Sequence, residues 1–191
     1  MKKLFPIIIV IALVCLSACA SESAPPEGTV ARVGEEYIYA ETIESDRLLG
    51  ASGTDREIVE GKVLNMLMLL EAEKLGLEAT QEEIDEFMVS REKAWNMAGV
   101  REQIEAMYEP LGIDFEEYKQ MLIELAPNTI ARQKLMDLYS EEYSENNSFD
   151  STEIAPSCQM TEYAVKQAEY VDEQLQKLWS KYKNEYDIYV E

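Results

Sequence analysis

The densest run of apolar residues in the chain lies between Ile58 and Leu75. These positions cover more than one side of a helix, which indicates a central helix with neighbours on several sides. Thr54, followed three residues later by Glu57, predicts a capping box at its start, and Gly76 predicts its C-terminal end. We therefore expect the other elements to pack around this helix.

Further helices are predicted where apolar residues recur at intervals of three and four. Thr80 with Glu83 and Asp114 with Glu117 predict two more helix starts, while Gly99 predicts an interruption. The expected helices cover 40–49, 80–98, 100–111, 114–126, 130–143 and 161–184.

Pro127 interrupts the helical pattern. Its ring clashes with the carbonyl four residues back and it donates no amide bond, so we expect the chain to break or kink there. Apolar periodicity resumes at Ile130 and continues to about Tyr143. We expect Ile43, Arg47 and Leu48 to face one way on their helix, and Leu125 to point inward.

Short β elements are predicted near both ends. Val30 to Tyr39 has β-forming residues on either side of Gly34, which indicates a hairpin or a strand and turn. Tyr186 to Val190 alternates and is also β-prone, so we expect it to pair with the Val30 region. The predicted fold class is mainly α, with a small two-stranded β element formed by the chain ends.

The first nineteen residues begin with two lysines, followed by an apolar run. That run is shorter than the roughly 20 residues of a spanning helix and is typical of a signal peptide. It ends in Leu16-Ser17-Ala18-Cys19, which resembles the bacterial lipobox; an uncleaved anchor and an ordinary secretory signal are the alternatives. We expect residues 1–18 to be removed and Cys19 to be lipidated.

Two acyl chains on Cys19 would hold the protein stably at the membrane, where one chain would not. The expected location is the extracytoplasmic face of a bacterial cell membrane. Residues 19–29 are polar, contain prolines and lack a period, so we interpret them as a tether.

The chain is strongly acidic, with 38 acidic and 17 basic residues and a net charge of −21. Cleavage removes Lys2 and Lys3, leaving 15 basic residues and a net charge of −23. This charge repels phosphate backbones and argues against nucleic acid as a partner. Cleavage also removes Cys15 and lipidation occupies Cys19, so Cys158 is the remaining thiol and no intramolecular disulfide is expected.

The chain contains no histidine, which removes Ser-His-Asp and Cys-His catalysis and the commonest zinc ligand. Neighbouring acids at Glu82-Glu83, Glu116-Glu117 and Glu141-Glu142 point to different sides of their helices. The run 146–153 lacks the order of calcium ligands in an EF-hand. We expect no catalytic residue, no metal and no cofactor.

Three segments together resemble one protein family: V-A-R-V-G-E-E-Y-I from Val30, L-N-M-L-M-L-L-E-A-E-K-L-G-L-E-A-T-Q-E-E-I-D-E-F from Leu64, and L-G-I-D-F-E-E-Y-K-Q-M-L from Leu111. They resemble the N-terminal chaperone domain of SurA and of the foldase lipoprotein PrsA. The resemblance covers 30–143, and 161–191 is similar to the family's returning C-terminal helix and strand, which implies that both parts belong to one domain.

Full-length relatives carry a parvulin prolyl-isomerase domain between these two parts. Here only a linker, residues 144–160, holds that place. The resemblance therefore implies a chaperone that holds unfolded or extended segments of secreted proteins, without isomerase activity. The alternative is a helical lipoprotein that displays an interaction surface to one fixed envelope partner.

Methionine is flexible and polarizable, so methionines outside the core suit the binding of varied apolar peptides. Filling of the core is the alternative for any one of them. The residues predicted to form a peptide groove lie on the less regular helices: Met88, Trp95, Met97, Met107 and Met121. The pattern leaves the oligomeric state open.

Overall fold

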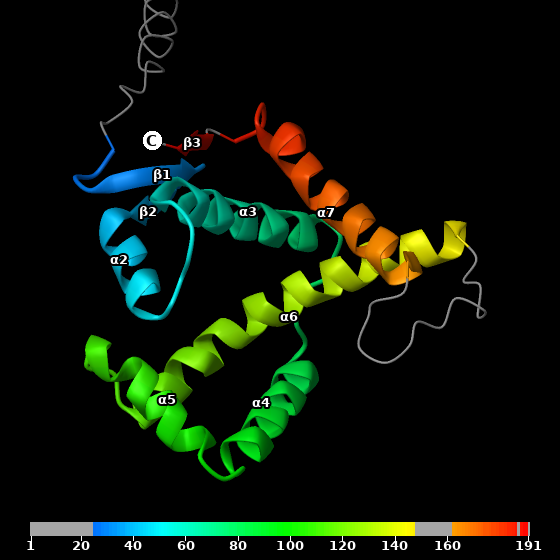
Figure 1. The fold of residues 1–191 in the computed structure, drawn as a ribbon. Helices are drawn as coiled ribbons and strands as arrows, with labels where there is room; N and C mark the ends of the chain where they lie inside the picture. Colours follow the sequence, from blue (N-terminus) through cyan, green and yellow to red (C-terminus); the bar gives the residue numbers. More distant parts are fainter. Residues whose placement is uncertain (1–24, 148–161, 187, 191) are drawn as a thin grey trace, which may run out of the picture.

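The computed structural model describes residues 25–147, 162–186 and 188–190. This part of the chain is mainly helical with a small antiparallel sheet, which confirms the predicted mainly-α fold class (Figure 1). The predicted signal peptide, Cys19 and Cys158 lie outside the described residues.

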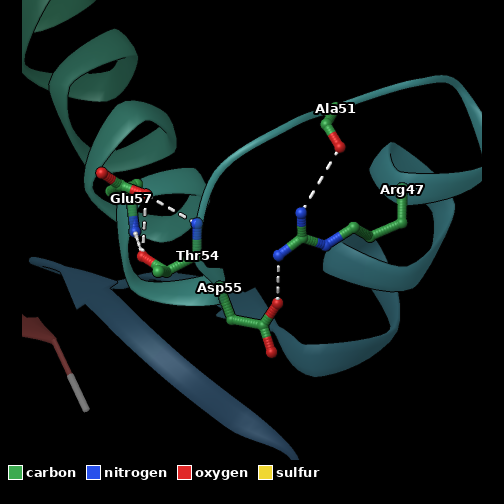
Figure 2. A network of polar contacts seen from close by, with 5 residues as sticks. All are labelled: Arg47, Ala51, Thr54, Asp55 and Glu57. Atoms are coloured by element: carbon green, nitrogen blue, oxygen red, sulfur yellow. Dashed lines mark hydrogen bonds and ion pairs between the residues drawn. The ribbon is translucent and has the colours of Figure 1, made fainter.

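Helix α3, Asp55–Lys74, is the central helix that the apolar run predicts. The Thr54 side chain accepts a hydrogen bond from the Glu57 amide, and the Glu57 carboxylate accepts one from the Thr54 amide (Figure 2). The predicted capping box is therefore confirmed. Gly76, with a φ of 67°, adopts the left-handed conformation typical of a helix end.

Three strands form the sheet, namely β1 (Thr29–Val33), β2 (Glu36–Tyr39) and β3 (Ile188–Val190). β1 lies in the middle and pairs antiparallel with both neighbours, so Ala31 is opposite Ile38 on one side and Val190 on the other. The expected hairpin and the pairing of the C-terminal strand are confirmed. The expected two-stranded element is corrected to three strands, because both partners pair with β1.

Helix α2, Ala40–Leu48, follows β2 directly and is joined to α3 by a short loop. Figure 2 shows Arg47 holding this loop: its guanidinium lies 2.7 Å from the Asp55 carboxylate and donates to the Ala51 carbonyl at 3.4 Å. The prediction that Leu48 faces the same way as Ile43 is wrong, since Ile43 is buried and the Leu48 side chain is 56% exposed. The Arg47 side chain points toward α3. Leu48 is the next residue, so it is turned about 100° away around the helix axis.

Two helices and a 3-10 turn follow α3, namely α4 (Gln81–Trp95), α5 (Val100–Tyr108) and η1 (Glu109–Leu111). The capping box of Thr80 and Glu83 starts α4, as predicted. Gly99 has a φ of 80° and separates α4 from α5, which confirms the predicted interruption. Gly112, with a φ of 69°, ends η1.

Helix α6, Phe115–Asn146, starts at the predicted capping box of Asp114 and Glu117. The expected break at Pro127 is wrong, because the helix continues through it. A proline inside a helix costs about 3 kcal/mol, and packing of α6 against both α3 and α4 offsets this cost. The expected inward position of Leu125 is also wrong: its neighbour Ala126 is fully buried, and Leu125 is 51% exposed.

Figure 1 shows α4, α5 and the start of α6 extending away from the layer formed by the sheet and α3. We call residues 81–126, which comprise α4, α5, η1 and the first part of α6, the distal arm. The second half of α6 passes below α3 and reaches the start of α7. α6 therefore connects the distal arm to the rest of the molecule.

Helix α7, Glu162–Tyr182, packs against the end of α6. Gln167 donates hydrogen bonds of 3.0 Å to the Ser140 carbonyl and the Ser144 hydroxyl. These contacts stabilise the last turn of α6, which ends at Asn146 rather than near residue 143. The first residues of the expected 144–160 linker are therefore helical, and 148–160 lie outside the described residues.

The core lies where the sheet, α3, α6 and α7 meet (Figure 1). α7 contributes the apolar stripe that its sequence predicts, with Val171, Leu175, Leu178 and Tyr182 buried. The inner face of the sheet covers α3 with Ala31, Val33 and Ile38. The C-terminal helix and strand thus share one core with the N-terminal hairpin and α3.

Candidate functional site

The five residues predicted to bind peptide all lie in or beside the distal arm, in different environments. Met97 is 64% exposed and Met107 is 52% exposed, while Met88 and Met121 are half-buried. Trp95 is buried. The hollow described below is lined by none of these five residues.

Trp95 belongs to an aromatic cluster that holds the distal arm together. Its ring meets Phe115 edge-on at 5.5 Å between centroids, and Tyr118 at 6.1 Å. Tyr108 lies 4.9 Å from Tyr118, and the Arg101 guanidinium lies 4.4 Å above the Phe115 ring. The Trp95 ring is therefore covered by the protein itself and joins α4 to α6.

An apolar hollow lies on the C-terminal half of α3. Met66, Leu69 and Leu70 form its floor, and Glu73 continues this stripe to the rim. The four residues follow the i, i+3, i+4, i+7 spacing of one helix face. The three apolar members are half-buried, so they remain partly accessible. The apolar surface of the central helix is therefore not completely covered by other elements.

The walls of the hollow come from segments distant in sequence. The β1–β2 turn, Val33 to Glu36, borders one part, Asn128 of α6 another, and Tyr186 lies beyond α7. The hollow has a volume of about 510 Å³, within the roughly 300–1,000 Å³ range of ligand sites.

Gly34 lets the turn approach Tyr186 closely. Its φ is 60°, and a Cβ placed there would lie 3.2 Å from Cδ1 of the Tyr186 ring. Only glycine adopts this backbone readily without a side chain that crowds the ring. The shape of this wall therefore depends on the absence of a side chain at position 34.

Three carboxylates surround the apolar floor: Glu35 and Glu36 on the turn, and Glu73 on α3. All three residues are exposed. None of the ion pairs within the described residues includes any of them. The hollow is thus apolar at its base and acidic at its rim.

A buried polar clamp joins α3 to α7 next to this stripe. Glu71 is 5% exposed, and its carboxylate accepts hydrogen bonds from the Lys181 ammonium at 2.5 and 2.6 Å and from the Tyr182 hydroxyl at 2.6 Å. Burial acts to raise the pKa of Glu71, but the bonds from Lys181 and Tyr182 outweigh it and hold the pKa below its usual value. The clamp fixes α7 against the helix that carries the floor.

Lys74 supports the same junction. Its ammonium lies 2.6 Å from the Glu185 carboxylate and 4.5 Å from the centre of the Tyr182 ring. The bond to Glu185 raises the pKa of Lys74, so this side chain is charged at neutral pH. Lys74 is therefore engaged toward the end of α7, although it follows the rim residue Glu73 in sequence.

Neither a metal site nor a spanning helix is found in the part of the chain that the structure describes. No group of three or more histidine, cysteine, aspartate or glutamate side chains there could hold a metal ion. No helix within 25–147 or 162–186 is long and apolar enough to cross a membrane.

Sequence reasoning placed Met66, Leu69 and Leu70 in the central helix but missed the hollow around them. The pattern showed that this helix is apolar on several sides, and it carried no information on which side stays uncovered. Glu71 was missed as well, although a carboxylate between Leu70 and Ala72 in the most apolar run was a signal for a buried polar contact.

The chain was compared with protein-family models, curated proteins and solved structures. None of the three comparisons found a match.

Proposed function

We propose that the chain is a membrane-anchored, extracytoplasmic holdase that binds unfolded or extended segments of secreted proteins. The observation that supports this most directly is the open apolar hollow on α3, lined by Met66, Leu69, Leu70 and Tyr186. Adaptable apolar side chains that remain half-accessible suit weak binding of varied peptide segments.

The proposal also rests on the path of the chain and on the sequence resemblance to SurA and PrsA. An N-terminal hairpin leads into helices α2 to α6, and α7 and β3 then return to pack on α3 and to pair with β1. This order of elements is the one that the sequence resemblance implies. In the proposal, the distal arm and the hollow offer two surfaces to a client, and lipid on Cys19 keeps the module at the membrane.

The proposal includes no prolyl-isomerase activity. Its basis is the short 144–160 segment in place of a parvulin domain, together with the absence of histidine. A proline-peptide isomerisation assay should give no acceleration above that of an unrelated acidic protein. A clear acceleration would contradict this part of the proposal.

Suppression of aggregation tests the holdase function. The mature chain from residue 19, with Cys19→Ser to prevent lipidation, is mixed in molar excess with several unrelated denatured clients, and light scattering is followed. We expect slower aggregation of all the clients. Equal aggregation with and without the protein would reject the holdase and favour a display protein with one fixed envelope partner.

Two sets of variants locate the binding surface in the same assay. Leu69→Gln places a polar group on the floor of the hollow, and it changes a residue that is not part of the buried core. Met97→Gln with Met107→Gln makes matched changes on the exposed side of the distal arm. If only Leu69→Gln abolishes the suppression of aggregation, the activity belongs to the hollow. If only the double methionine variant abolishes it, the activity belongs to the predicted methionines.

A further inference from the structure

We propose that the hollow on α3 selects segments in which apolar residues are flanked by lysine or arginine, and that Glu35, Glu36 and Glu73 make this selection. The inference rests on the proposed peptide binding and names the class of segment that the hollow accepts. Two observations carry it: the three carboxylates lie beside the apolar floor, and none of them is paired with a basic side chain of the described residues.

The backbone directs two of these acids to the floor. Glu36 is opposite Val33 in the β1–β2 register, and paired residues place their side chains on the same face of a sheet. Val33 is buried against α3, so Glu36 lies on the α3 side. Glu73 continues the stripe of Leu69 and Leu70 one turn further along α3.

No basic side chain of the described residues forms an ion pair with the rim carboxylates. Lys74 pairs with Glu185 at 2.6 Å. Arg132, one turn beyond Asn128 on α6, donates its Nε–H to the Asn128 carbonyl at 3.3 Å. Within the described residues, the three rim carboxylates therefore line the hollow without an ion-pair partner.

The physical consequence is a division of roles. Apolar residues of a bound segment displace water from Met66, Leu69 and Leu70, which provides affinity without strict sequence preference. Cationic residues beside them then come close to the rim carboxylates. Such rim contacts are individually weak and sensitive to salt, but they discriminate against acidic segments because like charges repel.

Three labelled peptides test the selection. Each carries the same central apolar residues, flanked by lysines, serines or glutamates, and fluorescence anisotropy measures binding to the mature chain carrying Cys19→Ser. At low salt we expect the lysine peptide to bind about tenfold more tightly than the serine peptide, and the glutamate peptide to bind more weakly still. High salt should reduce the difference while leaving the serine peptide bound.

The net charge of the whole protein could also attract the lysine peptide, so two variants with equal net charge are compared. The rim variant carries Glu35→Gln, Glu36→Gln and Glu73→Gln. The control variant carries three exposed substitutions away from the hollow, Glu102→Gln, Glu141→Gln and Glu169→Gln. We expect the rim variant to lose most of the preference for lysine and the control to keep it.

Equal loss of preference in both variants, or no loss in either, would overturn the proposed selection. If the serine peptide binds and the preference is absent, the selection is wrong while peptide binding stands. If none of the three peptides binds and aggregation is not suppressed, the proposed function itself fails.

Methyl NMR of methionine-labelled protein gives the location independently. Met66 lines the hollow, whereas Met97 and Met107 are exposed on the distal arm. Addition of the lysine peptide should shift the Met66 methyl signal and leave the other two in place. Shifts confined to the distal arm would overturn the assignment of the binding site to the hollow.

Discussion

The hydroxyl of Tyr182 donates a hydrogen bond of 2.6 Å to the carboxylate of Glu71, and both residues are buried at the junction of α3 and α7. The two residues are 111 positions apart in the chain. Burial and then the bond to Glu71 raise the pKa of Tyr182, so its hydroxyl keeps its proton across the physiological range. This contact ties the returning C-terminal helix to the central helix beside the hollow.

Removing that contact should weaken the fold. We expect Tyr182→Phe to lower the free energy of unfolding by about 1.5–3 kcal/mol, the range for a hydrogen bond to a charged group. Urea denaturation measures the change. Tyr189→Phe, at an exposed site on β3, is the matched control and should change stability by less than about 0.5 kcal/mol. Equal effects of the two substitutions would contradict a stabilising role for the clamp.

The capping box of α4 should make stability depend on pH. Hydrogen bonds from the Thr80 amide, and then from Lys134 and the Thr80 hydroxyl, lower the pKa of Glu83 to about 2. A carboxylate with a lowered folded-state pKa stabilises the protein above its unfolded value of about 4.3, and this stabilisation is lost as pH falls toward 2. Glu83→Gln should therefore reduce the melting temperature at pH 7 and have little effect near pH 2.

The control for this experiment is Glu86→Gln on the same helix, at an exposed residue outside the ion pairs of α4. Its effect should be small at both pH values. A Glu83→Gln effect that persists unchanged at pH 2 would show that the charge of Glu83 is not responsible.

Helix starts were predictable because capping is local. The pairs Thr54 and Glu57, Thr80 and Glu83, and Asp114 and Glu117 each form the expected capping box. The two interacting residues are only three positions apart, so the local sequence contains the whole interaction.

The helix break predicted at Pro127 is wrong because the local cost of the proline competes with contacts made far away in sequence. The neighbouring residue Ala126 is fully buried, and α6 packs on helices that precede it by tens of residues. Periodicity carries no measure of this tertiary packing, which keeps α6 continuous.

The hollow could not be predicted for the same reason. Met66 and Leu69 looked like core residues, and whether such residues are covered depends on a turn at Gly34 and on Asn128 of α6. Both segments are more than thirty residues away in sequence. The surface left open on α3 is a property of this long-range arrangement and not of the local pattern.

Gly34 offers a test of the wall of the hollow. Gly34→Ala places a Cβ at a φ of 60° and 3.2 Å from the Tyr186 ring. Gly28→Ala, at a φ of 80° with no atom within 4 Å of the Cβ, introduces backbone strain alone. Each strained site costs roughly 1–2 kcal/mol, so we expect both variants to lose stability in urea.

The Gly34 variant should lose more stability than the Gly28 variant, because its Cβ also displaces Tyr186. The affinity of the Gly34 variant for the serine peptide should change as well. The affinity of the Gly28 variant for the same peptide should stay the same. Equal stability losses and unchanged binding in both would show that the close approach of the turn to Tyr186 is unimportant.

The proposed membrane attachment depends on Cys19, which lies outside the described part of the chain. Cys19 ends the motif Leu16-Ser17-Ala18-Cys19, and lipid attached to it should anchor the mature protein. After Cys19→Ser, cell fractionation should find the protein outside the membrane fraction, whereas Cys158→Ser should leave it there. Retention of the Cys19 variant in the membrane would favour an uncleaved anchor.

The returning helix provides the most severe test of the architecture. Ending the chain after Ser157 removes α7 and β3, which bury Val171, Leu175, Leu178 and Tyr182 against the shared core. Each buried apolar side chain contributes about 1.5–3 kcal/mol, so the total is comparable with the 5–15 kcal/mol stability of a typical domain. The truncation also leaves one edge of β1 unpaired.

We therefore expect the truncated protein to lose cooperative thermal unfolding and to bind a hydrophobic dye, as molten states do. The matched control is Leu178→Ala in the full chain, which empties one fully packed position. That variant should still unfold cooperatively, with a loss of about 2–5 kcal/mol. A truncated protein with an unchanged, cooperative melting transition would show that α7 and β3 are an appendage and that the Glu71 clamp does not stabilise the fold.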